Sequence, residues 1–153
     1  MGKYLERSKN FDEQTVKHYA AEILLALEAL HKEKIIYRDL KPDNIVLDAE
    51  GHALLTDFGL SKKTTSIDDI NKSFCGTPAY LPLEIINKKG HNRMADWYEY
   101  GVVLYELYTG IPPFYADTRA ELYQNVRTGL IKFPRGTPEA FRDIIKRLLS
   151  QNP

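Results

Sequence analysis

The sequence contains little cysteine, no excess of either charge and no long hydrophobic run. Cys75 is the only cysteine among 153 residues, so no disulfide can form within the chain. This scarcity favours a reducing compartment, and we expect a cytoplasmic location. The 21 basic residues balance 21 acidic ones. The balance excludes the strongly basic proteins that bind nucleic acid or anionic membranes through net charge.

Apolar stretches in the sequence are too short to cross a membrane. The longest of them spans residues 101–114 and is interrupted by Glu106, whereas a membrane-spanning helix needs about 20 apolar residues. The first seven residues also lack the apolar core of a secretory signal. With 43% hydrophobic and 27% charged residues, the composition is typical of a soluble globular domain.

Hydrophobic periodicity and capping residues predict a mainly helical fold. Apolar side chains recur at helical spacing after Asp12, which can cap the first helix. A strongly apolar segment ends before Gly110, and Thr118 with Glu121 forms a capping box. The four predicted helices span residues 12 to about 32, 96–109, 118 to about 129 and 137 to about 150.

Two short extended runs lie between the first two helices. Residues 44–48 and 53–57 are separated by the turn-prone segment 49–52, which predicts one antiparallel β-ribbon. Residues 59–77 show no steady periodicity and carry many Ser, Thr, Asp and Lys residues, so we expect a long loop with a functional role. The predicted fold class is therefore mainly α with a small antiparallel β-ribbon.

Polar residues with complementary chemistry gather around this ribbon. Asn44 and Asp57 offer hard oxygen ligands, which suit Mg²⁺ shared with phosphate oxygens. Asp39 could orient or deprotonate an incoming hydroxyl group, and Lys41 could neutralise charge on a transferring phosphoryl group. Each residue alone would be interpreted as part of a solvated turn, but turns do not explain the complete ordered set.

The same residues form strings that resemble serine/threonine protein kinases. Residues 37–44 read Y-R-D-L-K-P-D-N and resemble the kinase catalytic loop, and residues 57–59 read D-F-G, like the metal-binding motif. Residues 74–84 resemble the end of a kinase activation segment, and residues 96–101 resemble the start of its buried central helix. Tyr37 in place of histidine, together with the F-C-G-T-P string, resembles the AGC group, which includes the cyclic-nucleotide-dependent kinases.

The resemblance implies a role for each polar residue around the ribbon. Asp39 would be the catalytic base that accepts the proton of the substrate hydroxyl, and Lys41 would steady the γ-phosphate of ATP. The position of Lys41 also implies protein substrates with Ser or Thr rather than Tyr as the target. Asn44 and Asp57 would hold two Mg²⁺ ions between the phosphates.

Neighbouring residues would take supporting roles by the same resemblance. Thr77 would contact both Asp39 and Lys41 and help serine or threonine substrates to dock. Val46 and its apolar neighbours would lie under the adenine of ATP, although they would equally suit a buried strand. Asp96 would hold the backbone of the catalytic loop from the central helix.

Ser73 occupies the place where kinases of this group are phosphorylated on the activation loop. A phosphate there would meet Arg38 and Lys62 and order the loop through charge-assisted hydrogen bonds. This interpretation implies an upstream activating kinase as a partner. An ordinary loop serine is the alternative, because several other hydroxyl groups are nearby.

Asp43 and Glu106 stand where related kinases read basic residues on the N-terminal side of the target hydroxyl. The resemblance therefore implies substrates with basic residues before the Ser or Thr. Solvation of a loop and a helix is the alternative explanation of these two carboxylates, and Ala79 replaces a third acidic residue of that surface.

Resemblance covers nearly the whole chain as the C-terminal, large lobe of a kinase domain, with the N-terminal lobe absent and the domain truncated at both ends. The glycine-rich loop and the lysine that grips the phosphates precede the matched region in such kinases, so we expect the 153 residues alone to be inactive. Residues 98–100 depart from the small and apolar residues usual in the central helix. Two hypotheses stay open: a piece of a competent kinase, or a non-catalytic binding or regulatory module.

Overall fold

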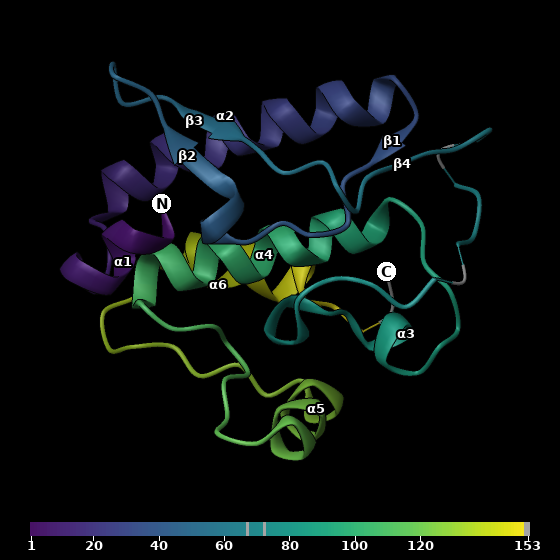
Figure 1. The fold of residues 1–153 in the computed structure, drawn as a ribbon. Helices are drawn as coiled ribbons and strands as arrows, with labels where there is room; N and C mark the ends of the chain where they lie inside the picture. The colour runs from purple at the N-terminus through teal and green to yellow at the C-terminus, as the bar shows by residue number, and fades with distance from the viewer. Residues whose placement is uncertain (67, 72, 152–153) are drawn as a thin grey trace.

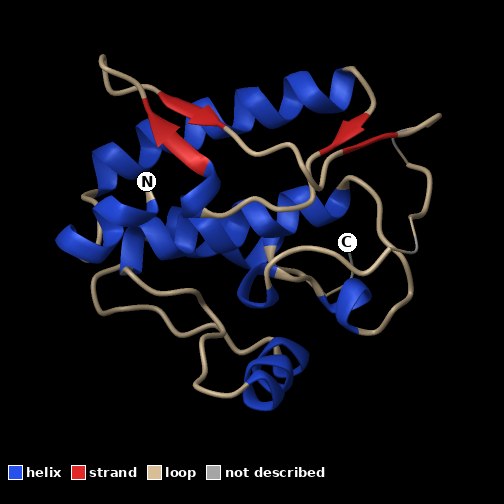
Figure 2. Cartoon of the chain, in the orientation of Figure 1, coloured by secondary structure: helices blue, strands red, loops and turns tan. Residues whose placement is uncertain are grey.

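The computed structural model describes residues 1–66, 68–71 and 73–151, and helices are its main regular elements (Figure 1). The helices are α1 (Gly2–Ser8), α2 (Glu13–Lys32), α3 (Leu83–Ile86), α4 (Met94–Thr109), α5 (Arg119–Thr128) and α6 (Glu139–Leu148). The strands are β1 (Ile35–Ile36), β2 (Ile45–Leu47), β3 (Ala53–Leu55) and β4 (Lys62–Lys63). Two 3-10 turns complete the order, η1 (Pro42–Asn44) and η2 (Pro78–Tyr80). The mainly α prediction is confirmed (Figure 2).

Helix α4 forms the centre of the molecule. It packs against α2 on one side and α6 on the other, and it is buried around most of its circumference because its residues are largely apolar. A Cβ atom at Gly101 would lie 2.7 Å from Cβ of Leu148, so glycine at this position lets α6 approach α4 closely. Gly110 ends α4 in the left-handed conformation, at φ 88°, as predicted.

Helix α2 supports the β-ribbon that the sequence predicts. The Asp12 side chain accepts hydrogen bonds from the backbone N–H groups of Gln14 and Thr15, at 3.0 and 3.1 Å, and so caps the helix. Strands β2 and β3 pair antiparallel, with Ile45 opposite Leu55. The ribbon lies against α2, which leaves the open end of the hairpin directed toward the centre of α4 (Figure 1).

A second small sheet was not predicted. Strand β1 pairs antiparallel with β4, and β4 falls inside the segment 59–77 that we expect to be a continuous loop. Strands of two residues carry no periodicity, so their pairing is decided by tertiary contacts rather than by local pattern. Residues 67 and 72 of this segment lie outside the described residues.

The remaining helix ends agree with the sequence in part. Thr118 accepts a hydrogen bond from the Glu121 N–H, as the capping box predicts. Helix α6 begins at Glu139, because the Thr137 hydroxyl donates to the carbonyl of Pro134 instead of capping the helix. Helix α1 was not predicted. In the described part of the chain, no helix combines the length and the apolarity needed to cross a bilayer.

Candidate active site

The central helix holds the catalytic-loop backbone through Asp96. Its two carboxylate oxygens accept hydrogen bonds from the backbone N–H groups of Tyr37 and Arg38, at 2.9 and 2.8 Å. The His31 ring lies 2.7 Å from the same carboxylate. Asp96 is completely buried, so these bonds replace the water that a carboxylate would otherwise need. The contact expected between Asp96 and this backbone is thus present.

Glu99, one turn further along α4, makes a contact that the sequence did not predict. Its carboxylate accepts a hydrogen bond from the Leu40 N–H at 2.8 Å. The side chain is 1% exposed, and its second oxygen has no hydrogen-bond partner among the described residues. Burial, with a further contribution from Asp96, raises the pKa of Glu99 well above its usual range. Glu99 therefore binds its proton more tightly in the folded chain than in the unfolded chain.

Glu99 should make stability depend on pH. The folded chain retains a proton at Glu99 that the unfolded chain releases above about pH 4.3. The free energy of unfolding should therefore fall as pH rises from about 5 to 8. Glu99→Gln keeps an acceptor for the Leu40 N–H and should reduce this fall, as measured by urea unfolding at pH 5, 6.5 and 8. Equal slopes for both proteins would contradict a raised pKa of Glu99 in the folded chain.

Asp39 lies where three side chains converge on one carboxylate. It accepts hydrogen bonds from the Lys41 ammonium, the Thr77 hydroxyl and the Asn44 amide, at 2.8, 2.8 and 3.0 Å. Lys41 also donates to the Thr77 hydroxyl at 2.8 Å, so the contacts expected of Thr77 are both present. Desolvation by burial acts to raise the pKa of Asp39, but the hydrogen bonds from Lys41, Thr77 and Asn44 outweigh it and lower the pKa. Asp39 is consequently ionised at neutral pH.

Asn44 joins the catalytic loop to the β-ribbon. Its amide nitrogen also donates to the backbone carbonyl of Asp39, at 2.9 Å. Its own backbone carbonyl accepts from the Thr56 N–H at 2.9 Å and from the Thr56 hydroxyl at 3.0 Å. Because Thr56 immediately precedes Asp57, this ladder brings Asp39, Asn44 and Asp57 to the open end of one hairpin.

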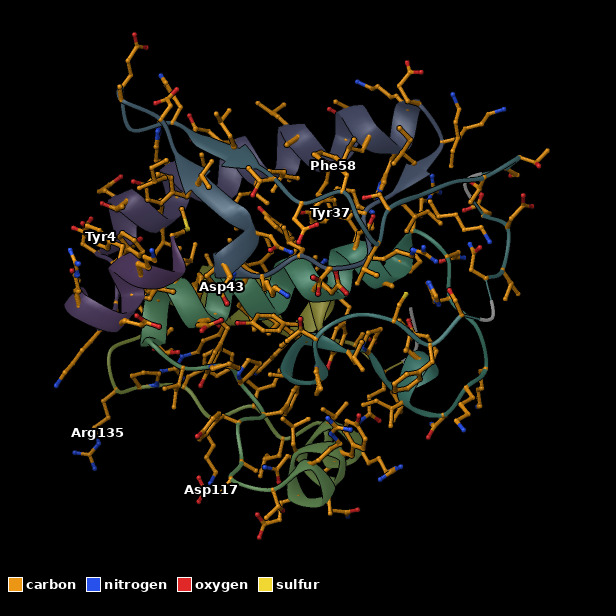
Figure 3. All side chains as sticks on the ribbon, in the orientation of Figure 1. Tyr4, Tyr37, Asp43, Phe58, Asp117 and Arg135 are labelled. Atoms are coloured by element: carbon orange, nitrogen blue, oxygen red, sulfur yellow. The ribbon has the colours of Figure 1, made fainter. Side chains whose placement is uncertain are left out.

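Asp57 is exposed beside this end of the ribbon. It adopts a left-handed backbone conformation, at φ 56°, which is uncommon for a residue with a side chain and is often found at functional sites. Its carboxylate accepts from the Gly59 N–H at 3.1 Å. The next residue, Phe58, packs edge-on against the buried Tyr37 ring with 5.4 Å between the centroids (Figure 3). The ring contact anchors the segment that carries Asp57.

The donor set fits Mg²⁺ and a phosphate-bearing nucleotide. The Asn44 amide nitrogen is committed to Asp39, so its carbonyl oxygen is the atom left to bind a cation. Together with the exposed Asp57 carboxylate this supplies hard oxygen ligands. Val46, expected under adenine, is 41% exposed on β2, so its apolar side chain is accessible to a ligand.

Ser73 contacts the catalytic loop through Arg38. The guanidinium donates to the Ser73 hydroxyl at 2.8 Å and to the Leu60 carbonyl at 2.6 Å. Lys62, expected to share a phosphate at Ser73, is exposed on β4 and forms no hydrogen bond with Ser73 in the part of the chain that the structure describes. Arg38 contacts Ser73 directly, and Lys62 lies close enough to His91 to lower the pKa of that ring.

His91 lies beside Ser73 and was missed by sequence reasoning. Ser73, His91 and Lys88 line one cavity of about 220 Å³. The imidazole is 3% exposed, and neither ring nitrogen has a hydrogen-bond partner among the described residues. Burial, aided by Arg38, lowers the pKa of His91. A neutral ring with an unused N–H group thus lines the cavity next to Ser73.

Glu106 and Asp43 interact within a second acidic region. The Tyr80 hydroxyl donates to the Glu106 carboxylate at 2.5 Å. Burial is the largest cause that raises the pKa of Glu106 to about 7, and Asp43 raises it further. Asp43 itself is exposed in η1 (Figure 3). The negative charge of Asp43 therefore acts on the Glu106 carboxylate.

The chain matches the protein kinase domain family over residues 1–153. It is 50% identical over 153 residues to the serine/threonine-protein kinase sck2 of Schizosaccharomyces pombe, a match that covers 98% of this chain and 24% of that protein. It is 46% identical over 147 residues to the cAMP-dependent protein kinase catalytic subunit of Dictyostelium discoideum, covering 96% of this chain and 22% of that protein. Against the serine/threonine-protein kinase Sgk3 of Rattus norvegicus the identity is 46% over 149 residues, covering 97% and 30%.

These relatives agree with the group that the motifs indicate. Two of them are named as serine/threonine-protein kinases and the third as a cAMP-dependent protein kinase, so the AGC-like resemblance is confirmed. The chain spans about a quarter of the length of the curated relatives that it matches, 24% and 22% in the first two cases. On its motifs, its fold and this match over its whole length, the chain belongs to the protein kinase family.

Proposed function

We propose that residues 1–153 form the large lobe of a serine/threonine protein kinase that transfers the γ-phosphoryl group of ATP to Ser and Thr hydroxyls of protein substrates. One observation carries this proposal. Asp39 is an ionised carboxylate held at once by Lys41, Thr77 and Asn44, at 2.8 to 3.0 Å. A carboxylate oriented in this way can accept a proton from an incoming hydroxyl group.

The proposed mechanism assigns one task to each polar residue. Asp39 orients the substrate hydroxyl and accepts its proton as the hydroxyl oxygen bonds to the γ-phosphorus, while the bond from that phosphorus to the bridging oxygen breaks and ADP leaves with the electron pair. Lys41, already within hydrogen-bond distance of Asp39 and Thr77, neutralises charge on the transferring phosphoryl group. Thr77 ties the activation segment to Asp39, so docking of that segment adds one of the three hydrogen bonds that orient the base. These are positioning and electrostatic tasks, which dominate phosphoryl transfer.

Asn44 and Asp57 would hold Mg²⁺, with the apolar surface at Val46 under the adenine of ATP. Bound there, Mg²⁺ would neutralise phosphate oxygens and align them for transfer. The support for this assignment is the donor chemistry of the two side chains and the ladder through Thr56 that ties them together.

Substrates with a basic residue before the target Ser or Thr are part of the proposal. The Glu106 carboxylate accepts a hydrogen bond from Tyr80, and Asp43 lies close enough to raise the pKa of Glu106. A basic substrate side chain placed near the two carboxylates would favour the charged form of Glu106 and be attracted by both. We also propose a cytoplasmic location, which the single cysteine supports.

We also propose that an upstream kinase regulates the protein by phosphorylating Ser73, and the contact between Ser73 and Arg38 supports this proposal. A phosphate adds a charge of about −1.5 to −2, which Arg38 can bind in place of the present hydroxyl contact. His91, with an unused N–H beside Ser73, could donate a further hydrogen bond. Since Arg38 adjoins Asp39, a phosphate fixed there would also fix the catalytic base.

A chimeric kinase tests this switch. In it, the chain replaces the matched segment of the Dictyostelium catalytic subunit, to which it is 46% identical. Phosphorylation of Ser73 should raise peptide phosphorylation about tenfold or more, Ser73→Ala should keep it low, and Arg38→Ala should abolish the difference. Arg135→Ala, at an exposed arginine far from the site (Figure 3), is the control. Full activity of Ser73→Ala after treatment with an activating kinase would place the switch elsewhere, with Thr64, Thr65 and Ser66 as the next candidates.

A further inference from the structure

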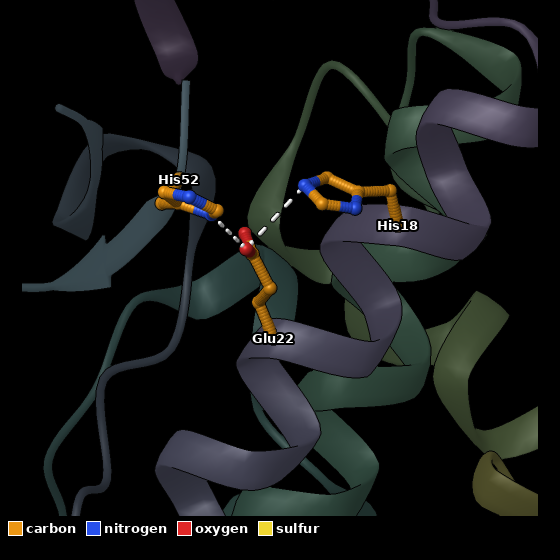
Figure 4. A group of neighbouring side chains, drawn as sticks. All are labelled: His18, Glu22 and His52. Carbon is orange, nitrogen blue, oxygen red and sulfur yellow. Dashed lines mark hydrogen bonds and ion pairs between the residues drawn. The ribbon is translucent and has the colours of Figure 1, made fainter. Parts of the chain in front are cut away.

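Two histidines and a glutamate meet where helix α2 supports the β-ribbon. His18 and Glu22 lie one turn apart on α2, and His52 lies in the turn that joins β2 to β3 (Figure 4). Their ligand atoms all lie within 4.8 Å of one another. The proposed kinase function uses none of the three residues.

Two of the three ligand-atom distances are close to those around a small tetrahedral cation. His18 Nε2 lies 3.4 Å from Glu22 Oε1, and His52 Nδ1 lies 2.5 Å from the same oxygen. Ligands about 2.0–2.1 Å from a tetrahedral Zn²⁺ are roughly 3.3 Å apart. The first distance already has this value, and the second would increase by less than about 1 Å as the cation replaces the hydrogen bond.

The surrounding backbone orients two of the three ligands. The second oxygen of Glu22 accepts a hydrogen bond from the Ala53 N–H at 2.7 Å. The Asp48 carboxylate accepts from the N–H groups of Glu50 and His52, both at 2.9 Å, and so fixes the turn. Supporting hydrogen bonds of this kind are what hold metal ligands in place. Here they leave Glu22 Oε1 directed at the two imidazoles.

The identity and exposure of the ligands select the class of cation. Imidazole nitrogens suit Zn²⁺ and its transition-metal neighbours, whereas Mg²⁺ and Ca²⁺ take oxygen ligands. The His18 and His52 side chains are 55% and 52% exposed, which gives a cation free access, while Glu22 is 20% exposed. Glu50, 3.9 Å from the other ring nitrogen of His52, adds negative charge nearby.

We propose that His18, Glu22 and His52 form a binding site for Zn²⁺ or a similar transition-metal ion, with water as the fourth ligand. An ion bound there would link the turn of the β-ribbon, through His52, to α2, through His18 and Glu22. The register places this turn at the end of the hairpin opposite Asn44 and Asp57, roughly 15 Å along the strands. It is therefore separate from the proposed Mg²⁺ site and acts by stabilising the ribbon that carries that site.

Calorimetric titration of the purified chain with Zn²⁺ tests the proposal. We expect one Zn²⁺ per chain with a Kd tighter than about 100 μM, measured with millimolar Mg²⁺ present so that oxygen-only sites are occupied. His18→Ala, His52→Ala and Glu22→Gln should each weaken binding at least tenfold. Saturating Zn²⁺ should raise the Tm by several degrees, and Co²⁺ in its place should show the visible absorption of a four-coordinate ion.

Two control variants separate this site from other sources of affinity. Glu28→Gln changes another glutamate on α2, paired with Lys32, and should leave Zn²⁺ binding unchanged. Cys75→Ser removes the single thiol and should also leave it unchanged. Three results would each overturn the proposal: a Kd weaker than about 100 μM, His18→Ala and His52→Ala variants that bind Zn²⁺ as tightly as the unaltered chain, or loss of binding in Cys75→Ser. Circular dichroism of every variant shows whether weaker binding comes from misfolding, and the titration of the unaltered chain decides the matter if the variants misfold.

Discussion

Asp57→Asn should lower peptide phosphorylation by the chimeric kinase roughly 10³-fold. The exposed Asp57 carboxylate is the charged ligand for Mg²⁺ in the proposed site, and a neutral amide would hold the cation far more weakly. Metal ions contribute several kcal/mol to such reactions, and each 1.36 kcal/mol corresponds to a tenfold change in rate. Initial rates on a Ser peptide, measured over a range of Mg²⁺ concentrations, give the effect. The variant should also need a higher Mg²⁺ concentration for half-maximal rate.

The matched control for this substitution is Asp117→Asn. Asp117 is an exposed carboxylate in a loop far from the ribbon (Figure 3), so its loss removes the same charge without touching the site. The control should keep the parental rate. If Asp57→Asn turned over within threefold of the parental rate at ordinary Mg²⁺, the assignment of Asp57 as a metal ligand would be wrong.

Asp39→Asn should lower kcat by about 10²- to 10⁴-fold, the usual contribution of general acid–base catalysis. The substitution keeps the size of the side chain but removes the charge that Lys41 and Thr77 now stabilise. Because Asp39 serves the hydroxyl and not the nucleotide, KM for ATP should change by less than about threefold. A loss confined to KM with kcat unchanged would assign Asp39 to binding alone. Thermal unfolding of the variant shows whether the fold is retained.

The sequence predicted the candidate site better than it predicted how the site is supported. The order of Asp39, Lys41 and Asn44 in one string, with Asp57 downstream, was enough to expect their grouping, because a hairpin returns the chain to its starting point. The contact between Glu99 and the Leu40 N–H was not predicted. It joins residues 59 positions apart, and no local pattern reports such a pair.

Local pattern also decided which elements of the fold could be predicted. Helix α2 and strands β2 and β3 have caps, periodicity or a turn of their own, and they were predicted within one or two residues. Strands β1 and β4 have two residues each, too few for a periodic pattern, and they are strands because they pair with each other across 26 or more positions of the sequence. His18 and Glu22 are visibly one helical turn apart in the sequence, but His52 joins them only once the ribbon is placed on α2.

The most direct test of the central claim is transfer of labelled phosphate from ATP to a Ser peptide by the chimeric kinase, with the unaltered Dictyostelium subunit as the reference. The proposed function predicts a rate within about tenfold of the reference, abolished by EDTA and by Asp39→Asn, and a much lower rate on the matching Tyr peptide. A folded chimera whose rate is no higher than that of its own Asp39→Asn variant would contradict the claim. It would favour a non-catalytic binding or regulatory module instead.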